Sequence, residues 1–162
     1  MSHYKLERFR QAQGEASSGF ETALEEIRAG RKRSHWIWYI FPQLAGLGSS
    51  ALSEIYAIDG SGEAAEYLKD PVLSERLLTI TTAAAEHLNS GVPLATLMGS
   101  RIDATKLMSS LTLFGHVASE LQKSQPGETY EALAGAAEAV LKAGESQGYH
   151  RCRFTLDRLG GE

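Results

Sequence analysis

The sequence concentrates aromatic and polar residues in one stretch, RKRSHWIWYIFPQLAGLGSS, which spans positions 31–50. Both tryptophans of the chain lie in it, behind a histidine and three cations. Core packing accounts for most of the six large side chains at 36–41. Successive side chains on a helix point about 100° apart, however, so these side chains cannot all face one core. The side chains that cannot face the core predict a pocket wall, with one of Trp36 and Trp38 buried and the other lining a cleft.

Polar groups on both sides of the aromatic run would supply the selective part of such a pocket. His35 precedes the run, Gln43 follows it, and a glycine-serine turn that includes Gly48 and Ser50 comes next. Backbone N–H groups ahead of a helix can bind an anion, although a tight turn with a serine cap explains the same residues. The turn lacks the lysine of a P-loop and a preceding strand, so neither a Walker nor a Rossmann nucleotide site is indicated.

A second polar cluster lies in the segment DATKLMSSLTLF, residues 103–114. On a helix Asp103 and Lys106 are neighbours, and Lys106 shares a face with Ser110. A lysine beside hydroxyl groups can hold an anion or polarise a substrate. The alternative is a helix-capping aspartate followed by small serines that permit close packing. Both interpretations stay open at this point.

The remaining reactive residue types form no recognisable motif. The histidines are scattered without an HxxH, HExxH or CxxC pairing, so we predict no metal site. The single cysteine, Cys152, excludes an internal disulfide, and we interpret its place beside His150 and Arg151 as incidental. No GxSxG motif nominates a nucleophile. The sequence therefore indicates neither a reaction nor a cofactor, and whether the protein is an enzyme is left open.

The net charge and composition limit the classes of partner that the protein can be expected to bind. The 162 residues carry a net charge of −4, which disfavours nucleic acid and anionic membranes as partners. No apolar run approaches the roughly 18 residues of a membrane helix, and the charged N-terminus lacks a secretory h-region. We therefore expect a soluble cytoplasmic protein, and no pattern indicates its oligomeric state.

Apolar residues recur with helical spacing along most of the chain. The clearest helix is expected over residues 71–88, with Pro71 in its first turn. Further helices are expected over residues 4–13, 20–29 behind a serine cap in SSGF, 50–56, 63–68, 103–118 behind an Asp103 cap, and 128–142. The tail from about residue 143 is expected to be less regular. WIWYIF suits a strand, but it has no partner strand. We therefore predict an all-α fold, a single compact orthogonal multihelical domain over residues 1–162.

Three segments carry a resemblance to a known family. They read GRKRSHWIWYIFPQLAGLGSSALSEIYAI, EAAEYLKDPVLSERL and DATKLMSSLTLF. They resemble successive motifs of the bacterial domain-of-unknown-function family eighteen-ten, and the resemblance runs from Leu6 to about Phe114. It implies a compact helical protein and no particular activity. The label calpastatin, which some members carry, implies a long disordered chain rich in proline, whereas this chain has 4 prolines and a periodic apolar pattern. We set that label aside.

Two classes of function fit these observations. In the first, a pocket between residues 35–50 and 103–114 binds or converts a small anionic or nucleotide-like ligand. The residues assigned to this pocket are His35, Trp36, Trp38, Gln43, Gly48, Ser50, Asp103, Lys106 and Ser110. In the second, the chain is a helical protein–protein interaction module, with exposed aromatic residues and a basic rim. A concave site favours the first class, and a flat aromatic patch favours the second.

Overall fold

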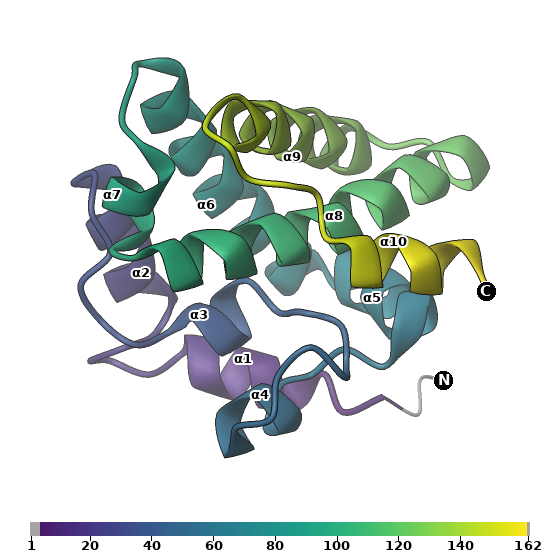
Figure 1. Ribbon diagram of the computed structural model, residues 1–162. Coiled ribbons are helices and arrows are strands. Elements are labelled where there is room, and N and C mark those ends of the chain that lie inside the picture. The colour runs from purple at the N-terminus through teal and green to yellow at the C-terminus, as the bar shows by residue number, and fades with distance from the viewer. Residues whose placement is uncertain (1–3, 162) are drawn as a thin grey trace.

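Three long helices form the centre of the protein in the computed structural model, which describes residues 4–161. They are α6 (Pro71–Asn89), α8 (Arg101–Ser124) and α9 (Glu128–Ser146), and α9 packs against both of the others (Figure 1). The other helices surround this centre: α1 (Glu7–Gln13), α2 (Phe20–Arg28), α3 (Ile37–Ile40), α4 (Ala51–Ile55), α5 (Gly60–Lys69), α7 (Leu94–Met98) and α10 (Arg153–Gly160). The predicted single all-α domain is confirmed. Residues 4–161 form no strand, and their isolated parallel β-bridge joins Leu44 and Ile58.

Each of the helices α6 and α8 begins at a capping residue. Asp70 caps α6 by accepting hydrogen bonds from the N–H groups of Val72 and Leu73, and Pro71 fills the first helical position, as predicted. The expected Asp103 cap of α8 is wrong. Gly99 ends the preceding helix in the left-handed region, with φ of +82°, so Ser100 becomes the cap. The hydroxyl of Ser100 accepts from the Asp103 N–H group, and Asp103 sits in the first turn.

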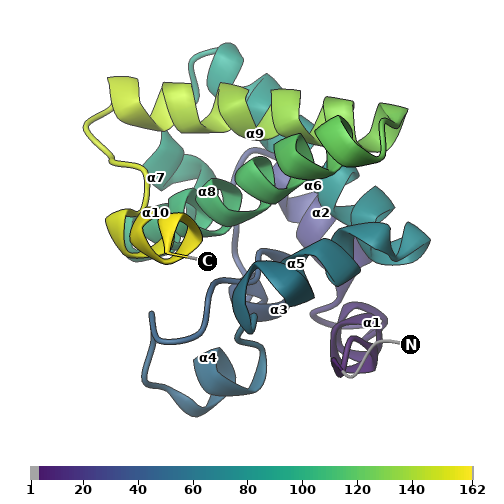
Figure 2. The ribbon, with the colours of Figure 1, turned by 90° about the vertical axis from the view of Figure 1, so that its right-hand side faces the viewer.

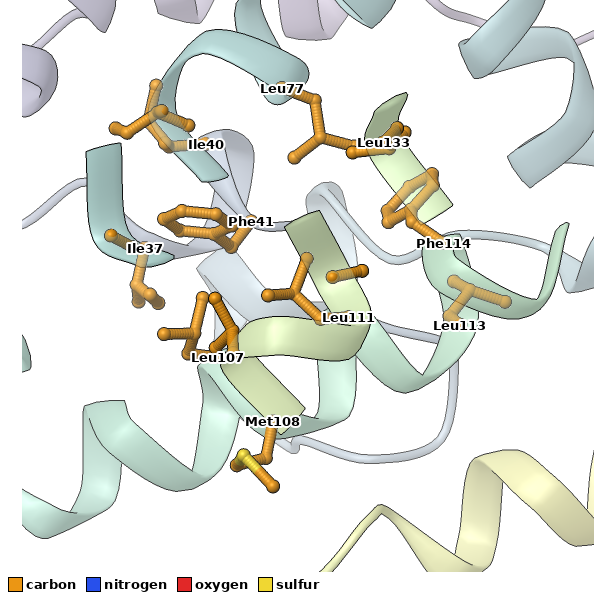
Figure 3. Close-up of a cluster of buried hydrophobic side chains, with 14 of the residues drawn as sticks. Ile37, Ile40, Phe41, Leu77, Leu107, Met108, Leu111, Leu113, Phe114 and Leu133 are labelled. Atoms are coloured by element: carbon orange, nitrogen blue, oxygen red, sulfur yellow. The ribbon is translucent and has the colours of Figure 1, made fainter. Parts of the chain in front are cut away.

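The core lies between these central helices and the short α3. Its side chains gather in one buried cluster (Figure 3), which includes Ile37, Ile40, Phe41, Leu77, Leu107, Leu111, Phe114 and Leu133. Residues 37–40 of the aromatic run form a single helical turn, so the run is helix rather than strand. Burial of large apolar side chains from four helices supplies the main driving force for this packing.

The C-terminal tail is more regular than expected. The helix predicted to end near residue 142 continues to Ser146, and residues 153–160 form α10. Tertiary contacts explain the difference, because the Arg151 guanidinium pairs with Glu138 and Glu145 of α9. Figure 1 shows the stretch between α9 and α10 passing beside α8 before α10 begins. This stretch is hydrophilic and has no periodic apolar pattern, so its packing could not be predicted from the sequence.

Two smaller expectations about the first half also change. The serine cap in SSGF is wrong, because Gly19 is the cap of α2 and makes no side-chain bond. A Cβ atom at position 19 would lie 2.1 Å from the Glu15 carbonyl oxygen, so this tight approach requires glycine. The helix expected over 63–68 extends over Gly60–Lys69.

Among the helices within residues 4–161, none has the length and hydrophobicity needed to cross a membrane.

Candidate functional site

The two tryptophans occupy different environments. Trp36 is fully buried, with 0% of its surface exposed, whereas Trp38 is half-buried. The Trp36 indole N–H donates to the Glu26 carboxylate at 2.9 Å. The same carboxylate accepts from the backbone N–H groups of Arg33 and Ser34. Glu26 therefore fixes the segment that leads into the aromatic run, a role that sequence reasoning missed.

The hydrogen bonds to Glu26 predict a defined pH dependence of stability. Burial alone would raise the pKa of Glu26, but hydrogen bonds from Ser34, the Arg33 N–H group and Trp36 lower it to about 2 from an ordinary 4.5. The stabilisation is therefore complete above pH 4.5 and is lost as the pH falls toward 2. Urea unfolding between pH 2 and pH 6 should show a smaller acid loss in Glu26→Gln than in the wild type. The exposed neighbour Glu25→Gln is the control, and an unchanged pH slope in Glu26→Gln would contradict the assignment.

Asp103 and Lys106 belong to a shared ion-pair network rather than to an open pocket. The Lys32 ammonium lies 2.8 Å from the Asp103 carboxylate, and that of Lys106 lies 3.8 Å from it. Each lysine also covers an aromatic ring, Lys32 over Trp36 at 4.9 Å and Lys106 over Trp38 at 5.3 Å. The positive charge of Lys106 is therefore already engaged by one carboxylate and one indole.

Apart from Asp103 and Trp38, the predicted site residues do not come together at Lys106. Trp38, Gln43 and Gly48 line a cavity of about 10 Å³, which holds at most about one water molecule. His35 is exposed, and Ser50 caps α4 by accepting from the Ser53 N–H group. Ser110 is fully buried, and its hydroxyl has no hydrogen-bond partner among the described residues. The structure therefore separates the predicted residues into an ion-pair network, a small cavity and isolated positions.

A larger cleft lies where the first half of α8 meets the C-terminal segment, and we call it the cationic cleft. It measures about 720 Å³ and is lined by Leu47, Arg101, Thr105, Ser109, Gly148, Tyr149, His150, Arg151, Cys152 and Arg153. Leu47 comes from the glycine-rich turn and Thr105 and Ser109 come from the 103–114 segment, but most of the lining comes from residues 148–153, outside both predicted segments. The turn is held there because Gly46 closely approaches the Phe154 ring of α10.

The charges that line the cationic cleft are positive, and its lining includes no carboxylate. The positive charge of Arg151 is compensated by its ion pairs with Glu138 and Glu145, and the hydrogen bonds to these carboxylates also raise its pKa. The Arg101 guanidinium stacks over the Tyr149 ring at 4.9 Å. Within residues 4–161, neither Arg101 nor Arg153 forms an ion pair. These two guanidinium groups therefore remain available to an anion.

The helix geometry adds to this positive potential. Arg101 is the first residue of α8, and Arg153 is the first residue of α10. The N-terminal end of a helix carries partial positive charge and N–H groups without intrahelical partners. Both helix starts thus contribute to the same cleft. The sequence signal was the HRCR run at 150–153, of which only the placement of Cys152 was interpreted, as incidental.

Comparison with known proteins places the chain in a family. The family model described as "Protein of unknown function (DUF1810)" matches residues 3–134. The chain belongs to this family. The C-terminal wall of the cationic cleft, residues 148–153, lies beyond the span that the DUF1810 model matches.

A solved structure extends this relationship over nearly the whole chain. The crystal structure of the conserved hypothetical protein Rv1873 from Mycobacterium tuberculosis is similar, with 33% sequence identity and a TM-score of 0.79. The alignment covers 98% of this chain and 99% of that chain, so the DUF1810 fold here includes the C-terminal segment. No curated protein matches the chain.

Proposed function

We propose that this protein binds a small anionic molecule in the cationic cleft. The observation that carries this proposal is the pair of arginines, Arg101 and Arg153, which line the cleft without an ion-pair partner among the described residues. Arginine presents a planar fork of N–H donors that suits carboxylate and phosphate oxygens. A volume of about 720 Å³ falls in the range of small-molecule sites.

The interaction-module alternative has one observation in its favour. Helix α4 buries none of its residues, and Leu52 and Ile55 on it are exposed. Figure 2 shows α4 standing away from the central helices. Two apolar side chains on a single turn form a small patch, and isolated exposed apolar residues are common on soluble proteins. The cationic cleft therefore supports a ligand-binding function more strongly.

Phosphate and pyrophosphate are the probes that test this proposal. We expect both to raise the melting temperature of the wild-type protein at low ionic strength, because binding to the folded state stabilises it. In Arg153→Gln the dissociation constant measured by calorimetry should rise at least about tenfold, since one charge-assisted hydrogen bond contributes roughly 1.5–3 kcal/mol. Arg153 is exposed, so the fold should be retained.

The matched control is Arg158→Gln in the same helix. Arg158 lies over the Phe154 ring and does not line the cleft, so this variant removes an equal charge from α10 at another place. Its affinity for pyrophosphate should stay close to that of the wild type. The absence of any stabilisation by either probe, or equal losses in the two variants, would overturn the proposed site.

A further inference from the structure

One wall of the cationic cleft carries hydroxyl groups in a regular stripe along α8. Thr105, Ser109 and Thr112 follow one another at helical spacings of four and three residues. Each hydroxyl donates its hydrogen to a carbonyl oxygen four residues earlier, at 3.0, 3.1 and 2.7 Å respectively. Such back-bonding is common for serine and threonine within helices. In this arrangement each hydroxyl oxygen keeps lone pairs that can accept a further hydrogen bond.

The Thr112 hydroxyl, the last of the three, accepts a hydrogen bond from the segment that leads into α10. A hydroxyl oxygen that has donated its hydrogen keeps lone pairs that can accept. The Thr112 oxygen accepts the backbone N–H of Cys152 at 3.1 Å, which holds the start of α10 against α8. Ser109 and Thr105 line the cleft one and two turns earlier, and no donor within residues 4–161 reaches either oxygen. The cleft therefore offers acceptors that its own residues leave unused.

These acceptors constrain the chemistry of the ligand. A fully ionised anion has no hydrogen to donate, so it bonds to the arginines, and it could bond to these hydroxyls only if they gave up their bonds to the helix carbonyls. Arg101 and Arg153 in turn offer only donors. A ligand that uses both walls must carry an anionic group and, beside it, groups that donate hydrogen bonds. Ser109 is 5% exposed, which makes an unused acceptor there costlier than one at the open surface.

The aromatic component of the cleft argues against a nucleobase as the donor-bearing part. Recognition of a base ordinarily uses an open aromatic face on which the base stacks. Tyr149 is 7% exposed, and the Arg101 guanidinium covers its ring. Leu47 and Cys152 also line the cleft, and neither offers an aromatic face. Hydroxyl groups on a short carbon chain or sugar ring fit this lining better than a flat heterocycle.

We infer that the ligand of the cationic cleft is a phosphorylated polyol, whose phosphate meets Arg101 and Arg153 and whose hydroxyls donate to Thr105 and Ser109. This inference rests on the proposed function, since it takes anion binding in the same cleft as its starting point. It narrows the ligand from any small anion to a sugar phosphate or a related phosphate ester that carries free hydroxyl groups.

Glycerol 3-phosphate and propyl phosphate form a matched pair of probes, because they share a three-carbon chain and a phosphate and differ only in two hydroxyl groups. Calorimetry on the full-length protein should give a dissociation constant about tenfold lower for glycerol 3-phosphate than for propyl phosphate. Ribose 5-phosphate should follow glycerol 3-phosphate. Inorganic phosphate keeps a P–OH donor at neutral pH, so it tests anion binding and not the preference for a polyol.

Variants assign the preference to particular side chains. The double variant Thr105→Val and Ser109→Ala should bind propyl phosphate as the wild type does and should lose the preference for glycerol 3-phosphate. The conservative double variant Thr105→Ser and Ser109→Thr keeps both oxygens and should retain the preference. Ser119→Ala, which removes an exposed hydroxyl elsewhere on α8, should change neither affinity.

The possible results distinguish the polyol inference from the proposed anion binding on which it rests. Equal affinities for the two esters, both weakened in Arg153→Gln, would overturn the polyol inference and leave anion binding standing. If the Thr105→Val and Ser109→Ala variant still prefers glycerol 3-phosphate, other groups of the protein bind the ligand's hydroxyls. This result would also overturn the inference. Failure of inorganic phosphate and both esters to bind would overturn the proposed function itself.

Discussion

Replacing Trp36 by alanine is expected to lower the free energy of unfolding by about 3–5 kcal/mol, measured by urea denaturation. The side chain is fully buried in the core, so its removal creates a cavity among close-packed neighbours. The substitution also takes away the indole N–H that donates to Glu26. The carboxylate that fixes the preceding loop then loses one of its donors, which adds to the cost of the cavity.

Trp38→Ala is the matched comparison two residues later. Trp38 is half-buried, lines a cavity of about 10 Å³ and lies under the Lys106 ammonium, so less apolar surface returns to water. The loss should be about 1–2 kcal/mol. Equal losses of 3 kcal/mol or more at both positions would mean that the whole aromatic run acts as core, contrary to the inequivalence that the structure shows.

The fold was largely predictable because its long helices carry strong local signals. The stripe behind Pro71 and the cap of α6 arise from residues close together in sequence, so periodicity and capping suffice to define that helix. The start of α8 depends on the left-handed backbone of Gly99, which a cap preference alone does not reveal. The C-terminal helix depends on Arg151 reaching Glu138, a contact between segments that no local pattern encodes.

The candidate site was less predictable, because charge and hydroxyl groups come together only through tertiary packing. The sequence predicted a pocket between residues 35–50 and 103–114, and the Lys106 ammonium lies over the Trp38 ring, while Leu47 and Ser109 line the cationic cleft. That prediction assigned the anion to Lys106, whose charge is shared with Asp103. The unpaired arginines lie 52 positions apart, at 101 and 153, so their meeting at the starts of two helices cannot be read from spacing.

The network around Asp103 illustrates why a charged residue in a polar cluster need not be a ligand group. Lys32 is one of the three cations that precede the aromatic run, yet only 5% of its side chain is exposed. A buried ammonium requires a charge partner or loses its proton. Asp103 supplies that partner, and the Ser34 carbonyl oxygen and the Trp36 ring complete the surroundings of Lys32. The aspartate therefore stabilises the junction between the aromatic run and α8.

Asp103→Ala should consequently destabilise the protein by about 3 kcal/mol in urea unfolding, because it leaves the Lys32 ammonium buried without an opposite charge. Lys106→Ala provides the control. Its ammonium lies 3.8 Å from the same carboxylate and its side chain is 29% exposed, so its loss should cost no more than about 1 kcal/mol.

A double variant tests whether the cost of Asp103→Ala arises from the stranded charge itself. Adding Lys32→Met to Asp103→Ala replaces the buried ammonium by an apolar side chain of similar length, so the double variant should be more stable than Asp103→Ala alone. Recovery of about 1–2 kcal/mol would match the desolvation cost of an unpaired buried charge. If the double variant is instead less stable than Asp103→Ala, Lys32 stabilises the fold through its hydrogen bond to Ser34 and its contact with Trp36, and the ion pair with Asp103 is not its main role.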